Sequence, residues 1–178
     1  VQVIGNTILR EKESGTIIRL LVAPVSKFEI LIGKLIPFYL VNLIQVAVLF
    51  AFGALVFDMD LRGSVPGLLV VTLGTAAAAN ALGLLIAALS RSTEQMGPMS
   101  GLILVVMAAL GGVLIPLFEM PRLMQAISLF TPHAWALKGY QDVMVRGYGV
   151  AELGPTVGAL FGFAVVFYLL ALWRFRFD

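Results

Sequence analysis

GLLVVTLGTAAAANALGLLIAAL, at residues 67–89, decides the fold class of this chain, because it holds no charged residue over a length that can cross a bilayer. A membrane-spanning helix needs about 20 mostly apolar residues, since the hydrocarbon core is about 30 Å thick. Three more stretches without Asp, Glu, Lys or Arg meet this requirement, namely residues 35–57, 99–118 and 156–173. Their apolar residues run continuously instead of alternating, which argues against the strands of a membrane barrel. We therefore expect an all-α, polytopic bundle of transmembrane helices with four complete spans.

The composition of the whole chain excludes several classes of protein. Of its 178 residues, 60% are hydrophobic and 12% charged, whereas soluble domains have about 45–50% and about 25%. A soluble domain of this length could not bury so much apolar surface, so a cytosolic enzyme is not expected. The net charge of +2 is too small to indicate a nucleic-acid partner. With no Cys and one His, no metal, cofactor or catalytic residue is predicted.

The Lys and Arg residues between the spans predict the orientation of the bundle. Four crossings place residues 10–34, the loop at 90–98 and the C-terminal tail on one side, with eight basic residues, and leave four on the other side. Basic residues favour the cytoplasmic side of a membrane. Both ends of this chain are therefore expected in the cytoplasm.

Residues 119–155 are expected to form an outer-face loop rather than a fifth crossing, because their charged and polar side chains would be costly inside a bilayer. The pattern predicts two short amphipathic helices lying at the outer interface. The first starts at Pro121, and the second has Thr131 as its N-cap and Pro132 as its first residue. His133 then reads as a helix-start residue on the outer face, without a ligand role.

Residues 10–34 are too polar to span and are expected to lie along the cytoplasmic face. Pro24 breaks a helix there, and Ser26 begins a capping box that leads into the first span, with a bend near Pro37. Physical chemistry alone favours an interfacial anchor, and a docking surface for a cytoplasmic partner is the alternative. Gly33-Lys34 does not form a Walker A motif, so any ATP would be hydrolysed by a separate chain.

Three runs in this cytoplasmic segment share a pattern with a known family: REKESGT at 10–16, LLVAP at 20–24 and FEILIGK at 28–34. They resemble the R-E-x-E-x-G-T, L-L-x-x-P and E-I-L-x-G-K segment in the membrane permease subunits of type-2 ABC exporters, which serve bacterial drug and lipid export. PHAWAL at 132–137, followed by Gly147, is similar to the P-x-x-W…G stretch before the last span of that family.

The resemblance implies a partial transmembrane domain over residues 1–178, the C-terminal portion of a six-span permease. Residues 1–9 would then be the end of a preceding span. It also implies that residues 10–34 couple the permease to an ATPase subunit. The residues of this segment that we expect to make this contact are Glu11, Glu13, Gly15, Thr16, Arg19, Pro24 and Glu29.

The function implied by the resemblance is that of a permease subunit in the bacterial inner (plasma) membrane. It would export a hydrophobic or amphipathic substrate with a second permease subunit, identical or paralogous, and a separate ATP-binding subunit. The chain itself would be no enzyme, and ATP would bind only to the partner subunit.

A few polar side chains inside the spans are candidates for a substrate path: Asn42, Gln45, Thr75 and Asn80. The alternative is hydrogen bonding between helices, worth about 0.6 kcal/mol on average. The spans lack the ionisable side chains that ion-coupled carriers place there. An ion-coupled carrier or channel without ATP, and a membrane anchor that only assembles a complex, remain the alternative functions.

Overall fold

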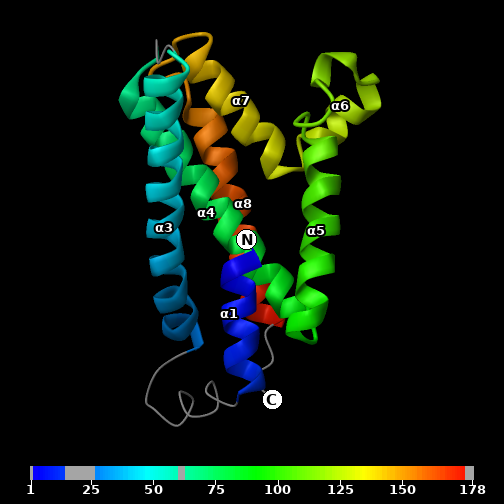
Figure 1. Ribbon diagram of the computed structural model, residues 1–178. Helices are drawn as coiled ribbons and strands as arrows, with labels where there is room; N and C mark the ends of the chain where they lie inside the picture. Colours follow the sequence, from blue (N-terminus) through cyan, green and yellow to red (C-terminus); the bar gives the residue numbers. More distant parts are fainter. Residues whose placement is uncertain (1, 15–26, 60–62, 175–178) are drawn as a thin grey trace.

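The computed structural model describes residues 2–14, 27–59 and 63–174, and the regular structure of these ranges is entirely helical (Figure 1). The helices in chain order are α1 (Gln2–Glu13), α3 (Lys27–Val56), α4 (Val65–Leu89), α5 (Thr93–Leu110), the short 3-10 helix η1 (Leu117–Glu119), α6 (Arg122–Ser128), α7 (Pro132–Met144) and α8 (Gly154–Arg174). Four of them, α3, α4, α5 and α8, are long and apolar enough to cross a membrane. The prediction of an all-α bundle with four spans is confirmed.

Helix α4 forms the centre of the bundle. It packs along α8 and also contacts α1, α3, α5 and α7. Within its most apolar stretch 61% of the residues are buried, whereas none of the corresponding stretch of α3 is. The small residues of α4 allow this packing, since a Cβ atom at Gly74 would lie 3.1 Å from the Cβ atom of Leu160 in α8.

The third span differs from its prediction at both ends. Helix α5 runs from Thr93 to Leu110, not over residues 99–118. Ser92 caps its start by accepting a hydrogen bond of 3.3 Å from the N–H of Gln95, and Pro98 lies inside the helix. At the other end Gly112 has a φ of +84°, which terminates a helix readily. Residues 111–118 are uncharged, and for that reason a criterion based on charge alone included them in the span.

Four helices share one apolar cluster. It consists of Ile4 and Ile8 from α1, Leu31 from α3, Leu84 from α4 and Ala171 from α8. The two helices that flank residues 15–26 are therefore both fastened to the central pair α4 and α8. The predicted helix start at Ser26 and the break at Pro24 lie outside the described residues.

The two short helices between α5 and α8 are present, but only the start of the second is placed as predicted. Pro121 precedes α6 as its cap instead of being its first residue. Helix α7 begins at Pro132, and its N-cap Thr131 accepts a hydrogen bond of 3.4 Å from the N–H of Ala134.

Helix α7 is packed into the bundle, and its position relative to the outer interface stays a prediction. It packs against α4 and α8 and slants toward the end of α5 (Figure 1). Its buried face includes Gly139, where a Cβ atom would lie 2.9 Å from the side chains of Val71 and Thr156. This close approach to two other helices draws α7 into the bundle, and such a long-range contact is not visible in the periodicity of α7 itself.

Candidate functional site

The structure brings the predicted polar residues of the spans together in one region. Asn42 and Gln45 of α3 face Thr75 of α4 across a groove of about 210 Å³. The remaining lining residues are Val46 and Leu49 of α3, Thr72, Ala76 and Ala79 of α4, and Tyr140 of α7. The two α3 residues are three positions apart and therefore share a face of their helix.

The fourth predicted residue, Asn80, is joined to this group by a hydrogen bond. The Nδ2 atom of Asn42 donates to the Oδ1 atom of Asn80 at 2.8 Å. Asn80 is only 3% exposed, and its own Nδ2 atom has no hydrogen-bond partner among the described residues. The side chain also lines a second, apolar groove of about 410 Å³ between α3, α4 and α8. One buried amide thus connects the polar groove with an apolar one.

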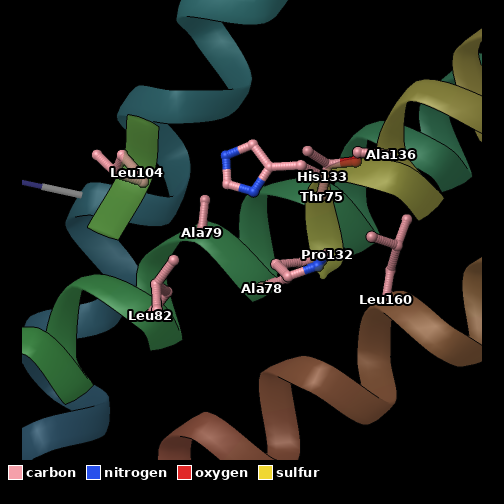
Figure 2. Close-up of a pocket in the computed structure, with 9 residues that line it drawn as sticks. All are labelled: Thr75, Ala78, Ala79, Leu82, Leu104, Pro132, His133, Ala136 and Leu160. Carbon is pink, nitrogen blue, oxygen red and sulfur yellow. The ribbon is translucent and has the colours of Figure 1, made fainter. Parts of the chain in front are cut away.

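Two residues of α7 complete this polar region, and the sequence did not indicate either. Tyr140 donates a hydrogen bond of 3.3 Å to the hydroxyl of Thr72. His133 lies at the start of α7, as predicted, and its ring points into the bundle (Figure 2). Both lie in a segment outside the apolar spans, so a search limited to polar residues within spans could not find them. The small residues of α7, such as Gly139, were the available signal that this helix packs closely.

His133 lines a cavity of about 80 Å³ where α4, α5, α7 and α8 meet. Figure 2 shows its ring projecting from the start of α7 into the space lined by Ala79 of α4 and Leu104 of α5. The other lining residues are Thr75, Ala78, Leu82, Pro132, Ala136 and Leu160. Burial lowers the pKa of His133, which favours the neutral imidazole.

This cavity and the polar groove are neighbours, because Thr75 and Ala79 line both. Their linings contain amide, hydroxyl and imidazole groups and no Asp, Glu, Lys or Arg. Such groups can form hydrogen bonds with a neutral molecule but offer no counter-charge to an ion. Among the described residues, no group of three or more His, Cys, Asp or Glu could hold a metal ion.

The predicted coupling residues that the structure describes lie at the opposite end of the bundle from α6, where α1 ends and α3 begins (Figure 1). Glu11 of α1 forms an ion pair with Lys34 of α3. Glu13 is the last residue of α1, and Glu29 is exposed in the first turn of α3. Gly15, Thr16, Arg19 and Pro24 lie outside the described residues.

The start of α3 is held against α8 by an aromatic contact. The rings of Phe28 and Tyr168 meet edge to face with centroids 5.7 Å apart. The hydroxyl of Tyr168 also donates a hydrogen bond of 3.3 Å to the carbonyl of Phe28. The start of α3 is therefore fastened to α8 as well as to α1.

Comparison with known proteins identifies the family of this helical bundle. Residues 1–173 match the family described as ABC-2 family transporter protein. The inner membrane transport permease YhhJ of Escherichia coli (strain K12) is 30% identical over 175 residues, which cover 97% of this chain and 46% of YhhJ. The linearmycin resistance permease protein LnrN of Bacillus subtilis (strain 168) is 28% identical over 172 residues, covering 97% of this chain and 44% of LnrN.

A third relative is named "Probable multidrug ABC transporter permease YbhR" in Escherichia coli (strain K12). It is 30% identical over 144 residues, which cover 80% of this chain and 38% of YbhR. No solved structure shows a significant match to the chain. The chain spans less than half the length of each of these curated relatives. Its four apolar helices and the match over residues 1–173 together show that this membrane-embedded chain belongs to the ABC-2 family of transporter permeases.

Proposed function

We propose that this chain is part of a permease subunit that exports a hydrophobic or amphipathic molecule, drug-like or lipid-like, from the cytoplasm. A separate ATPase subunit supplies the energy, and this chain carries out no hydrolysis. Family membership supports the transport role, and two relatives carry names that refer to linearmycin resistance and to multidrug transport. The location is the bacterial inner membrane, with the end of α8 in the cytoplasm.

The uncharged groove is the single observation that most directly supports this proposal. Asn42, Gln45 and Thr75 come from two helices yet line one space, and hydrophobic side chains surround them. A molecule with an apolar body and a few neutral polar groups matches such a lining. Ion-coupled carriers place an Asp, Glu, Lys, Arg or His in their path, and none of these lines this groove. The single His133 lines the adjoining cavity, where burial lowers its pKa and favours its neutral form.

The ion pair and the apolar cluster at the cytoplasmic end suggest how a partner subunit acts on the groove. Closure of an ATPase subunit would push residues 10–34, and Glu11 with Lys34 would transmit the displacement to α1 and α3. The shared cluster would pass it on to α4 and α8. The partner would thus shift an equilibrium between two arrangements of the helices, one open to each side of the membrane.

A second permease subunit is the partner expected within the membrane. Helix α3 buries none of its most apolar stretch, and α5 buries 11%. In the assembled transporter these faces contact lipid or the second subunit. The groove beside α3 would then open toward the interface between the two subunits.

The proposal is tested by asking whether the complete permease binds a cytoplasmic ATPase through the predicted coupling residues. The permease is co-expressed with a candidate ABC ATPase subunit from the same genome, and the ATPase that co-purifies is quantified. We expect Glu13→Lys and Arg19→Glu to abolish co-purification, because each reverses a charge at the contact. Glu152→Lys, a matched reversal before α8 on the expected outer side, should leave it unchanged.

The alternatives predict different outcomes. Transport that persists without an ATPase and follows an ion gradient would indicate an ion-coupled carrier. A complex that assembles but transports none of a panel of hydrophobic drugs, linearmycin included, would indicate a membrane anchor.

A further inference from the structure

The cavity beside His133 contains two polar atoms that the described fold leaves unpaired. The Nδ1 atom of His133 and the Oγ1 atom of Thr75 are both buried, and neither has a hydrogen-bond partner among the described residues. Buried polar atoms in folded proteins nearly always have a partner, either in the protein or in ordered water. Two such atoms lining one cavity indicate that something else supplies the partner.

Contacts with neighbouring segments fix the position of His133 at the start of α7. A Cβ atom at Gly111, just after α5, would lie 2.6 Å from the Cβ atom of His133. Glycine at this point therefore lets the end of α5 approach the start of α7. Thr131 holds the other side by donating a hydrogen bond of 2.8 Å to the carbonyl of Ser128. The imidazole is thus placed in the cavity by contacts from two directions.

The size and walls of the cavity restrict what can enter. Its volume of about 80 Å³ exceeds the roughly 10–15 Å³ that one water molecule requires on a comparable measure. Apart from Thr75 and His133, the lining side chains are Ala, Leu and Pro, which offer no hydrogen bond. An occupant must therefore be a small polar group, and it meets no opposite charge.

The cavity also adjoins the predicted substrate path. Thr75 and Ala79 line both the cavity and the groove that holds Asn42 and Gln45. The cavity and the groove therefore lie on either side of the same two residues of α4.

We propose that this cavity is a subsite for an uncharged hydroxyl group of the transported molecule. The hydroxyl donates a hydrogen bond to the Nδ1 atom of His133 and accepts one from the hydroxyl of Thr75. The preferred substrates are then amphipathic alcohols and polyols, and ammonium or carboxylate groups are excluded from this position because the walls hold no counter-charge. This inference rests on the proposed transport function and refines it. Water has the same hydrogen-bonding chemistry, so the test separates the two.

The subsite is tested by placing a single cysteine in its wall, which is practical because this chain contains no native Cys. Ala79→Cys is introduced into the complete permease assembled with its ATPase in proteoliposomes, with any cysteines elsewhere replaced. Three methanethiosulfonate reagents of similar size are compared: the neutral hydroxyethyl, the cationic trimethylammonioethyl and the anionic sulfonatoethyl form. Rates are normalised to those of Phe130→Cys, whose native side chain is 80% exposed.

We expect the neutral reagent to modify Ala79→Cys at least about tenfold faster than either charged reagent, because an unpaired charge is costly to bury. Adding Thr75→Val or His133→Leu should slow the neutral reagent by about fivefold, the effect of one hydrogen bond. Thr75→Ser, which keeps the hydroxyl, should retain the faster rate. Equal rates for all three reagents, no reaction at Ala79→Cys, or insensitivity to both second-site variants would each overturn the proposal.

A competition experiment separates a substrate hydroxyl from water. Monolauroylglycerol, which carries two free hydroxyls, should protect Ala79→Cys, whereas methyl laurate, which has none, should not. If neither amphiphile protects, water alone occupies the cavity and the proposal is wrong. Labelling does not require transport. A negative labelling result would therefore overturn the subsite but not the proposed permease function, which the ATPase co-purification experiment tests.

Discussion

A polar side chain inside a span can hold two helices together or contact substrate. The two polar atoms of the Asn80 side chain differ in this respect. Its Oδ1 atom accepts the hydrogen bond from Asn42, which fastens α3 to α4. Its Nδ2 atom is buried without a partner among the described residues, and this atom contributes nothing to the packing of the helices. A role in packing therefore explains the Oδ1 atom of Asn80 but not its Nδ2 atom.

Removing each member of the pair distinguishes packing from a substrate path. Asn42→Leu and Asn80→Leu both delete the interhelical hydrogen bond, so each should weaken the association of α3 with α4 by about 0.6 kcal/mol, and at most by about 1.7 kcal/mol. If the pair also contacts substrate, each variant should reduce export by more than its loss of thermal stability accounts for. The measurements are the melting temperature and the export rate of the complete transporter.

Ser100→Ala is the matched control for this pair. The hydroxyl of Ser100 is buried but donates to the carbonyl of Met96, 2.7 Å away in its own helix. Ser100→Ala should therefore change neither the melting temperature nor the export rate of the transporter. Losses of export in both asparagine variants, in proportion to stability, would leave hydrogen bonding between helices as the whole explanation.

The residues of the candidate site divide into those that the sequence could indicate and those that it could not. Asn42, Gln45 and Thr75 stand out because a polar side chain is rare within an apolar span, so their type and position carried the information. His133 and Tyr140 lie in a polar connection, where such residues are ordinary. Only the packing of α7 against α4 and α8 makes them part of the site.

At the level of the helices, the Glu11–Lys34 ion pair joins the two elements that flank the expected coupling segment. The side chain of Lys34 is 17% exposed and that of Glu11 30%. Breaking the pair should therefore cost more than the roughly 0–1 kcal/mol of an exposed pair and less than the roughly 3–5 kcal/mol of a fully buried one. The pair lies beside the segment expected to receive the push of the ATPase.

Charge reversal tests this pair. Glu11→Lys and Lys34→Glu should each uncouple ATP hydrolysis from export, because two like charges then separate α1 from α3. The double variant restores an attractive pair and should recover coupling, measured as the export rate per ATP hydrolysed. If the double variant is as impaired as the single ones, the two side chains do not act through each other.

The helices also show where reading apolar stretches succeeds and where it fails. Helices α4 and α8 were predicted closely, because continuous apolar sequence is what a bilayer requires. The predicted span extended beyond the end of α5 because Gly111 and Gly112 are uncharged, although the helix ends there through backbone geometry. The slant of α7 depends on its contacts with Val71 and Thr156, which no local pattern contains.

For the whole molecule, the arrangement of the helix ends agrees with the distribution of charge. The end of α1, the start of α3, the turn from α4 to α5 and the end of α8 lie at one end of the bundle (Figure 1). The described basic residues there include Arg10, Lys34, Arg91 and Arg174. At the opposite end, two basic residues interact with neighbouring side chains. Arg146 pairs with Asp142 at 2.5 Å, and the Nζ atom of Lys138 lies 5.4 Å from the centre of the Trp135 ring.

This asymmetry predicts an orientation that can be measured in intact cells. Because Lys and Arg are retained on the cytoplasmic side, a cysteine at Ser92, in the turn between α4 and α5, should react with a membrane-impermeant maleimide only after the cells are permeabilised. A cysteine at Glu152, before α8, should react in intact cells. The same two sites in permeabilised cells control for accessibility, since both should then be modified. Modification of Ser92→Cys but not of Glu152→Cys in intact cells would invert the bundle and place the expected ATPase contact on the wrong side of the membrane.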